Sequence, residues 1–294
     1  MLEKNNQRVF VNGEFFSKKE ASISVFDRGF LFSDSVYEVT AVLDGNLVDW
    51  TEHFARLIRS LGHLNLENNF QEEDFYQIQR KLINENQLKE GLCYVQVTRG
   101  VAERDFNFAK KSLLPTVVIF TQEKQILNNA ASKVGIKIIT VPDDRWRRRD
   151  IKTTQLLAQS LAKTHAVQEG VDDSLLVQGG FINEGSSSNV FIFKDERIIT
   201  PSLSNDILGG ITRSSVIKFC QINNIEIKEQ KINIDDLMNA QEVFLTSATG
   251  FVLPVIEVNG RRVGNGLVGD TVKKIQHIYI CLLYTSDAAD DLWC

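Results

Sequence analysis

Three short segments of the sequence carry groups that could do chemistry together. Lys152 has a primary amine, which can attack an aldehyde and form an imine. Glu184 begins the run Glu-Gly-Ser-Ser-Ser-Asn, and a buried carboxylate can keep a ring nitrogen protonated. The segment 209–212 reads Gly-Gly-Ile-Thr, and a helix that begins after glycines offers free N–H groups to a phosphate. An aldehyde, a ring nitrogen and a phosphate are all present in pyridoxal phosphate (PLP), so we expect this cofactor.

Each segment has an ordinary explanation when it is considered alone. A single lysine is usually an exposed charge, and a glutamate before glycine is often only a turn residue. Gly-Gly-Ile-Thr is also a common way to begin a helix. The three segments together favour the cofactor hypothesis.

The sequence around these residues resembles the class IV aminotransferases, which are PLP enzymes of fold type IV. The stretch 150–158 is similar to the family segment that carries the cofactor-linked lysine, and the stretch 184–189 is similar to the family pattern Glu-Gly-(Ser/Thr)-x-Ser-Asn. The resemblance extends to about residue 280. It implies an α+β fold of two domains, a small N-terminal α/β domain and a larger, sheet-rich C-terminal domain.

The resemblance also implies a cofactor site. Lys152 would be the catalytic residue, and the guanidinium of Arg56 would suit a phosphate, although an arginine on a helix is usually only an exposed charge. Many relatives carry a hydroxyl where this chain has Ala248, so the hydroxyl contact would fall to Ser247 or Thr249. The expected cofactor-binding residues are Lys152, Glu184, Arg56, Leu208, Gly210, Ile211, Thr212, Ser247 and Ala248.

Among class IV enzymes, the chain is most similar to bacterial D-amino acid aminotransferases, particularly over Val95–Gly100. In that group an Arg-x-His motif reaches the neighbouring subunit's site and binds the substrate carboxylate. Here the motif reads Arg104-Asp105-Phe106, so one cationic anchor remains and the second position is apolar. The expected substrate-binding residues are Tyr37, Arg104, Phe106 and Thr249. The resemblance implies a homodimer that moves an amino group from a D-amino acid to a 2-oxo acid by a ping-pong mechanism.

Several alternatives share this scaffold. An (R)-selective amine transaminase has less need of a carboxylate clamp, so Phe106 makes it the main alternative. A branched-chain L-amino acid aminotransferase and an aminodeoxychorismate lyase are weaker alternatives. A non-catalytic homologue that binds PLP, or one that has lost it, is disfavoured because Lys152, Glu184 and Arg56 are all present.

Composition excludes several other classes of function. The chain has 294 residues and a net charge of −5, whereas nucleic-acid binding usually needs a basic surplus. The arginine-rich run 145–149 is flanked by aspartates, and we interpret it as a charged loop that leads into the lysine segment. Four cysteines without metal or redox spacing and the lack of a signal peptide or long apolar run predict a cytoplasmic protein with no metal site.

Hydrophobic spacing predicts the domain boundaries. We expect a first domain over residues 1–121, a linker over 122–133, a PLP-binding domain over 134–280 and a non-native or disordered tail over 281–294. Apolar residues at steps of three and four predict a helix capped by Thr51, and a later helix capped by Thr153 or Thr154. Asn12-Gly13 predicts a tight hairpin turn.

Overall fold

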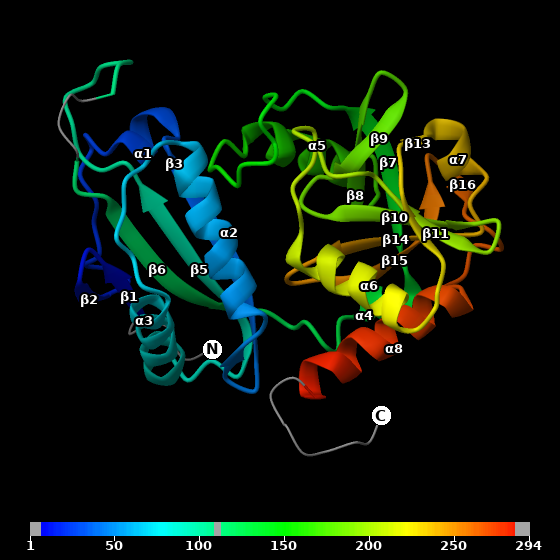
Figure 1. Ribbon diagram of the computed structural model, residues 1–294, viewed down its shortest axis with the longest axis horizontal. Helices are drawn as coiled ribbons and strands as arrows, with labels where there is room; N and C mark the ends of the chain where they lie inside the picture. The colour runs from blue at the N-terminus through cyan, green and yellow to red at the C-terminus, as the bar shows by residue number, and fades with distance from the viewer. Residues whose placement is uncertain (1–6, 109–112, 286–294) are drawn as a thin grey trace. The chain divides into compact units, whose positions relative to one another are not determined.

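The computed structural model describes residues 7–108 and 113–285, which form two compact units (Figure 1). The first unit contains Met1–Gln125 together with the short stretch Ile151–Gln155. The second contains Ile126–Asp150 and Leu156–Cys294. Lys152 therefore belongs to the first unit, although its position in the sequence lies well inside the second.

The first unit is built on a six-stranded antiparallel sheet with the order β2-β1-β6-β5-β3-β4. The predicted hairpin at Asn12-Gly13 is confirmed, and both residues have the positive φ angles that a tight turn of this kind requires. The strands are β1 (Arg8–Val11), β2 (Glu14–Ser17), β3 (Ser35–Leu43), β4 (Asn46–Leu47), β5 (Glu90–Thr98) and β6 (Thr116–Glu123).

Three helices accompany this sheet: α1 (Arg28–Phe32), α2 (Trp50–His63) and α3 (Glu72–Glu85). Figure 1 shows α2 lying across the sheet, where its buried residues Phe54, Leu57 and Leu61 follow the predicted spacing. The prediction that Thr51 caps α2 is wrong. The helix begins one residue earlier, and the Thr51 hydroxyl donates instead to Glu72, 2.7 Å away.

The second unit contains a ten-stranded mixed sheet with the order β12-β11-β10-β14-β15-β7-β8-β9-β13, and β16 pairs with β15. The pairs β11–β12, β15–β7 and β7–β8 are parallel, and the others are antiparallel. The strands are β7 (Ile136–Pro142), β8 (Asp173–Gln178), β9 (Phe181–Gly185), β10 (Asn189–Lys194), β11 (Arg197–Thr200), β12 (Ile227–Glu229), β13 (Ile232–Asn233), β14 (Glu242–Ser247), β15 (Phe251–Val258) and β16 (Arg261–Arg262).

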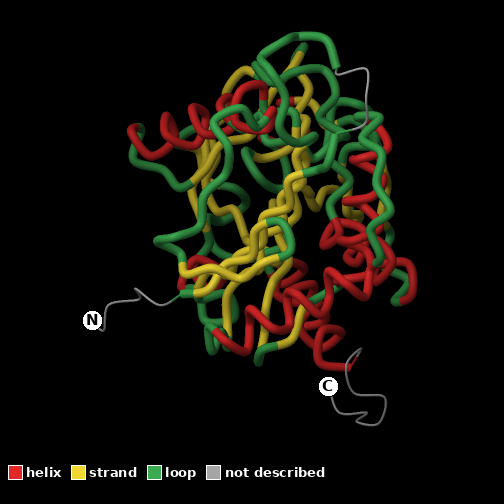
Figure 2. Tube along the Cα trace, turned by 90° about the vertical axis from the view of Figure 1, so that its left-hand side faces the viewer, coloured by secondary structure: helices red, strands yellow, loops and turns green. Residues whose placement is uncertain are grey.

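The helices of the second unit are α4 (Ala130–Val134), α5 (Leu157–Gln168), α6 (Ile211–Ile222), α7 (Ile234–Met238) and α8 (Asp270–Thr285). Neither Thr153 nor Thr154 caps α5, contrary to the prediction, because both pair with the start of β3 instead. Helix α8 continues past residue 280 into the predicted tail, of which residues 286–294 lie outside the described part. Figure 2 shows in green the loops that connect these elements.

None of the helices in residues 7–108 and 113–285 combines the length and apolar character needed to cross a bilayer. Within the same residues, no group of His, Cys, Asp and Glu side chains is arranged to hold a metal ion.

Candidate active site

Lys152 lies beside β3, where the structure holds it through its backbone. Its carbonyl accepts the N–H of Tyr37 at 3.0 Å, and Thr153 bridges to Val36 in the same strand. The Lys152 Nζ stands 4.2 Å from the centre of the Tyr37 ring, which is a cation–π distance. The structure thus brings together two of the predicted residues, the catalytic lysine and the pocket tyrosine.

Arg56 is buried on α2 and is oriented by a carboxylate that the sequence analysis did not select. Glu38 Oε1 accepts from Arg56 Nε at 2.7 Å, and Oε2 accepts from Nη2 at 2.8 Å. His53 Nδ1 lies 2.8 Å from the same Oε2. Burial alone raises the pKa of Glu38, but Arg56, assisted by His53, overcomes this effect and holds that pKa well below its usual range. The ionised Glu38 fixes the plane of the guanidinium.

Glu184 lies at the end of β9, where its carboxylate receives three donors. Arg145 Nη1 donates to Oε1, while Asn189 Nδ2 and the Leu208 N–H donate to Oε2 at 3.0 and 3.1 Å. Burial raises the pKa of Glu184 above its ordinary value, although Arg145 and the Leu208 N–H oppose this shift. The structure therefore joins Glu184 to Leu208, two residues expected at the cofactor.

The arginine-rich run is not simply the charged loop that the sequence suggested. The side chains of Arg145 and Arg149 are both buried and converge on Asp143, which lies 2.8 Å from Arg145 Nη2 and 3.5 Å from Arg149 Nε. Arg149 also binds Asp206 at 2.8 Å and Gln178 at 2.7 Å. Acidic partners on either side of the run gave a signal for pairing, but the sequence could not show that the pairs are buried.

The segment before α6 approaches Glu184 closely. The Leu208 carbonyl accepts from Asn189 Nδ2 at 2.8 Å, and a Cβ on Gly210 would lie only 2.1 Å from Asn189 Oδ1. Glycine is therefore required at this point of contact. No side chain caps the helix that begins at Ile211, and Thr212 is buried in its first turn. Its N-terminal N–H groups and the positive end of its dipole suit a phosphate.

A second turn follows β14 and contains the other predicted phosphate-binding residues. Ser247, Ala248 and Thr249 form this turn, and the Ser247 Oγ accepts the Gly250 N–H at 3.1 Å. Strand β14 pairs with β10 so that Thr246 lies opposite Asn189, the residue that touches Gly210. The turn and the start of α6 are thus linked through adjacent strands of one sheet.

Two buried hydroxyls near these turns are not satisfied. Ser188 Oγ and Thr246 Oγ1 have no hydrogen-bond partner among the described residues. Buried polar atoms are normally paired, so two unpaired hydroxyls beside an uncapped helix have hydrogen-bonding capacity that a polar ligand could use. The N–H groups at the start of α6 fit the phosphate of PLP. The close contact between Gly210 and Asn189 fits the placing of the ring beside Glu184.

Arg104 and Phe106 lie in the first unit, on the exposed segment that follows β5. The Arg104 guanidinium is 5.5 Å from the rings of both Phe32 and Phe106, and Phe106 is 78% exposed. Arg28 donates to the Asp105 carbonyl at 2.7 Å and thereby holds the segment in place.

Sequence reasoning missed two groups that position the expected residues, namely Glu38 and Arg145. Glu38 stood in the sequence between residues of a β-branched and aromatic strand, and a charge on the buried face of such a strand needs a partner. For Arg145 the available signal was its aspartate neighbours. Neither signal identifies the partner, because each partner comes from a distant part of the chain.

Comparison with known proteins identifies the family. Residues 35–258 match the family Amino-transferase class IV. A D-alanine aminotransferase of Staphylococcus aureus (strain MSSA476) is 38% identical over 92% of this chain and 95% of its own length. A D-alanine aminotransferase of Bacillus licheniformis is 35% identical over 92% and 94%.

Solved structures share the fold. A branched-chain amino acid aminotransferase from Escherichia coli superposes with a TM-score of 0.85 at 24% identity, over 98% of this chain and 97% of its own. The T.th. branched-chain amino acid aminotransferase with pyridoxamine 5'-phosphate gives a TM-score of 0.85 at 25% identity, over 94% and 93%. The predicted two-domain α+β fold is confirmed, and the chain belongs to the class IV aminotransferases, a family of PLP-dependent enzymes.

Proposed function

We propose that this protein is a PLP-dependent aminotransferase that moves an amino group from a D-amino acid to a 2-oxo acid by a ping-pong mechanism. The observation that carries the proposal is the pairing of Lys152 with Tyr37 in one unit and of Glu184 with Leu208 in the other. D-alanine aminotransferases that cover nearly the whole chain support the choice of substrate.

Bound PLP supplies an aldehyde and a ring that accepts electrons from the substrate. Arg56, whose guanidinium plane is fixed by Glu38, would bind the phosphate. The N–H groups at the start of α6, at Gly210, Ile211 and Thr212, would also bind it, as would the turn at Ser247 and Ala248. Leu208 would support the face of the ring.

The remaining groups handle protons. Glu184 would accept a hydrogen bond from the protonated ring nitrogen, and its three donors keep the carboxylate in one orientation. Lys152 Nζ would take up and return the proton of the substrate Cα, as general base and acid. The neighbouring Tyr37 ring would orient Nζ and line the substrate pocket. Thr249 would contribute a hydroxyl to that pocket.

Lys152→Ala tests the catalytic assignment. We expect turnover to fall by roughly 10²–10⁴-fold or more, because the general base is lost, and the visible absorbance of lysine-linked PLP to disappear. Lys89→Ala is the matched control, since Lys89 is an exposed lysine of the same unit. Normal turnover in Lys152→Ala would show that another group performs the proton transfer.

A half-reaction scan tests the substrate. The PLP-loaded protein is mixed separately with D-alanine, D-glutamate, L-leucine, L-glutamate and (R)-1-phenylethylamine, and the conversion of the cofactor spectrum is followed. Rapid conversion by the D-amino acids supports the proposal. Conversion by the L-amino acids alone would contradict it.

An (R)-selective amine transaminase is the second candidate, because Phe106 stands where D-amino acid aminotransferases carry a histidine. Its exposed ring packs edge-on against Phe32 at 5.6 Å, which makes this part of the anchor apolar. Faster conversion by (R)-1-phenylethylamine than by D-alanine would favour this candidate. Phe106→His should then shift the preference toward D-alanine.

We further propose that the protein is a cytoplasmic homodimer in which the Arg104 segment binds the substrate carboxylate in the partner subunit. Exposed apolar side chains surround this segment and would be covered by a second copy: Phe26, Phe30, Val101, Phe106, Phe108 and Leu114. Sedimentation should give a dimer, and Arg104→Gln should raise KM more than it lowers kcat. A monomer with full activity would exclude this arrangement.

A further inference from the structure

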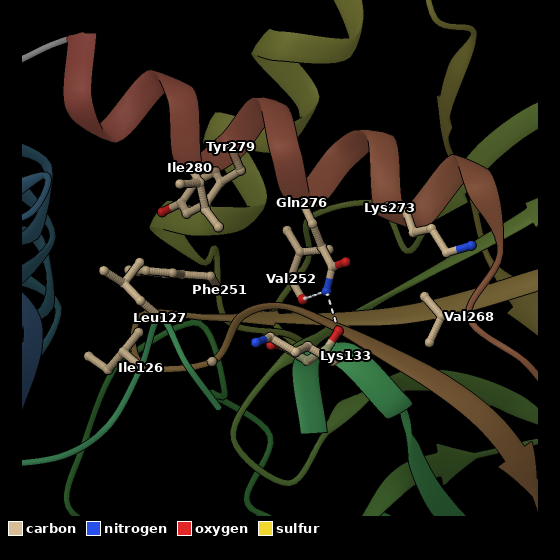
Figure 3. Close-up of a pocket in the computed structure, with 12 residues that line it drawn as sticks. Ile126, Leu127, Lys133, Phe251, Val252, Val268, Lys273, Gln276, Tyr279 and Ile280 are labelled. Carbon is tan, nitrogen blue, oxygen red and sulfur yellow. Dashed lines mark hydrogen bonds between the residues drawn. The ribbon is translucent and has the colours of Figure 1, made fainter. Parts of the chain in front are cut away.

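The second unit contains a cavity of about 350 Å³ that none of the proposed catalytic residues lines. Its walls come from the segment before α4, from the start of β15 and from α8 (Figure 3). Its volume falls at the lower end of the range of roughly 300–1,000 Å³ found for ligand pockets.

The side chains that line the cavity have one chemical character. Most are apolar, and the charged residues among them are two lysines, with no acidic residue. The lining residues used below are Ile126, Leu127, Lys133, Phe251, Val268 and Lys273. An apolar body with a single negative charge is the ligand that complements this set.

The two lysines differ in their availability. Lys273 forms an ion pair with Asp270 at 3.0 Å, whereas Lys133 forms no ion pair with any residue in the described ranges. Figure 3 shows the Lys133 ammonium directed toward the end of the cavity that Ile126 and Leu127 form. An unpaired cation beside an apolar wall is placed to receive the charged head of a ligand whose body occupies the cavity.

The walls of the cavity are held in place by polar contacts. Gln276 Nε2 on α8 donates to the Ser132 carbonyl at 2.8 Å and to the Val252 carbonyl at 3.0 Å, which joins three elements (Figure 3). The Phe251 and Tyr279 rings pack with their centres 5.2 Å apart. The cavity is therefore formed without a ligand, which reduces the ordering cost of binding.

We propose that this cavity binds an apolar monocarboxylate, with Lys133 pairing with the carboxylate and Phe251, Leu127 and Val268 enclosing the apolar body. The proposal does not depend on the amino donor that the enzyme uses. It assigns to the second unit a small-molecule site that is separate from the residues proposed to bind PLP.

Titration calorimetry of the PLP-loaded protein with octanoate tests the proposal, and octyltrimethylammonium is the probe of opposite charge. We expect one octanoate per chain, and no comparable binding of the cation. Lys133→Gln should weaken octanoate binding about fivefold, because the pair is partly exposed. Lys218→Gln, an exposed lysine of the same unit outside the cavity, should leave it unchanged.

Two variants separate this cavity from the substrate site. Val268→Phe should abolish octanoate binding by filling the cavity while turnover persists. Arg104→Gln should not affect octanoate binding. Loss of binding in Arg104→Gln with unchanged binding in Lys133→Gln would place octanoate in the substrate site and overturn the proposal, as would equal affinity for the cation.

Discussion

Each unit buries a glutamate against an arginine that lowers its pKa, but the net shifts of the two carboxylates are opposite. In the first unit Glu38 receives both ends of the Arg56 fork and a His53 contact, and its pKa is lowered. In the second unit Glu184 receives one N–H of Arg145, and burial raises its pKa. The difference follows from how many charged donors each carboxylate has.

The second arginine is shared. Arg145 also binds Asp143 through Nε at 2.9 Å and Nη2 at 2.8 Å, so only part of its charge acts on Glu184, and Asp143 itself repels Glu184. In the first unit the carboxylate orients an arginine that we propose binds phosphate. In the second unit the arginine orients a carboxylate that we propose holds a ring nitrogen. The same pair of residue types thus serves two different purposes.

The largest effect on stability is expected from Glu38→Gln. It removes the buried carboxylate that pairs with the Arg56 guanidinium, which should reduce the free energy of unfolding by about 3–5 kcal/mol. Urea unfolding of the apoprotein measures this. Glu67→Gln, an exposed glutamate of the same unit, is the control. A loss below about 1 kcal/mol, the usual value for a surface pair, would mean that the pair is solvated.

The difference in stability between wild type and Glu38→Gln should also depend on pH in a defined direction. Because the folded pKa of Glu38 is lowered, its ionisation stabilises the protein above the ordinary carboxyl pKa of about 4.3 and this contribution is lost as the pH falls below it. The difference between wild type and variant should therefore shrink on acidification. A difference that grows would contradict the Arg56 pairing.

Glu184→Gln should act mainly on the reaction. A neutral amide cannot hold a cationic ring nitrogen as a carboxylate does, and we expect kcat to fall by roughly 10²–10³-fold. Because the folded pKa of Glu184 is raised, its ionisation costs stability as the pH rises above the ordinary carboxyl value. The apo variant should thus gain stability relative to wild type over this range, opposite to Glu38→Gln. Glu184→Asp keeps the charge and should recover part of the rate.

The sequence predicted the parts of this comparison that depend on neighbouring residues. The strands, the helices at α2 and α3 and the glycine before α6 follow from local spacing, and the family segments selected Lys152, Arg56 and Glu184. The pairing partners could not be predicted, because Glu38 and Arg56 come from a strand and a helix, and 39 positions separate Arg145 from Glu184. The prediction that Thr51 caps α2 failed for a similar reason, since its hydroxyl binds Glu72, which lies 21 positions later in the chain.

Arg145→Lys tests the second pair by replacing the guanidinium, which donates to both Asp143 and Glu184, with a single ammonium group. A lysine has one ammonium group and cannot bind Asp143 and Glu184 in the same geometry, so we expect a loss of about 2 kcal/mol in the free energy of unfolding. The pKa of Glu184 should rise further, which moves the acidic limb of the kcat/KM profile to higher pH. Arg147→Lys, at an exposed arginine two positions away, should change neither quantity. An unchanged pH profile in Arg145→Lys would show that Arg145 does not set the pKa of Glu184.

The smallest effect is expected at two buried hydroxyls, one in each unit. Thr40 Oγ1 and Thr246 Oγ1 both lack a hydrogen-bond partner among the described residues, so replacing either threonine with valine should change stability by less than about 1 kcal/mol. Only Thr246 precedes the turn that we propose binds phosphate. Thr246→Val should therefore weaken PLP binding severalfold in a fluorescence titration, while Thr40→Val should not. Equal PLP affinity in the two variants would mean that the Thr246 hydroxyl makes no hydrogen bond to the cofactor. Removing a hydroxyl that binds neither protein nor ligand does not change the affinity.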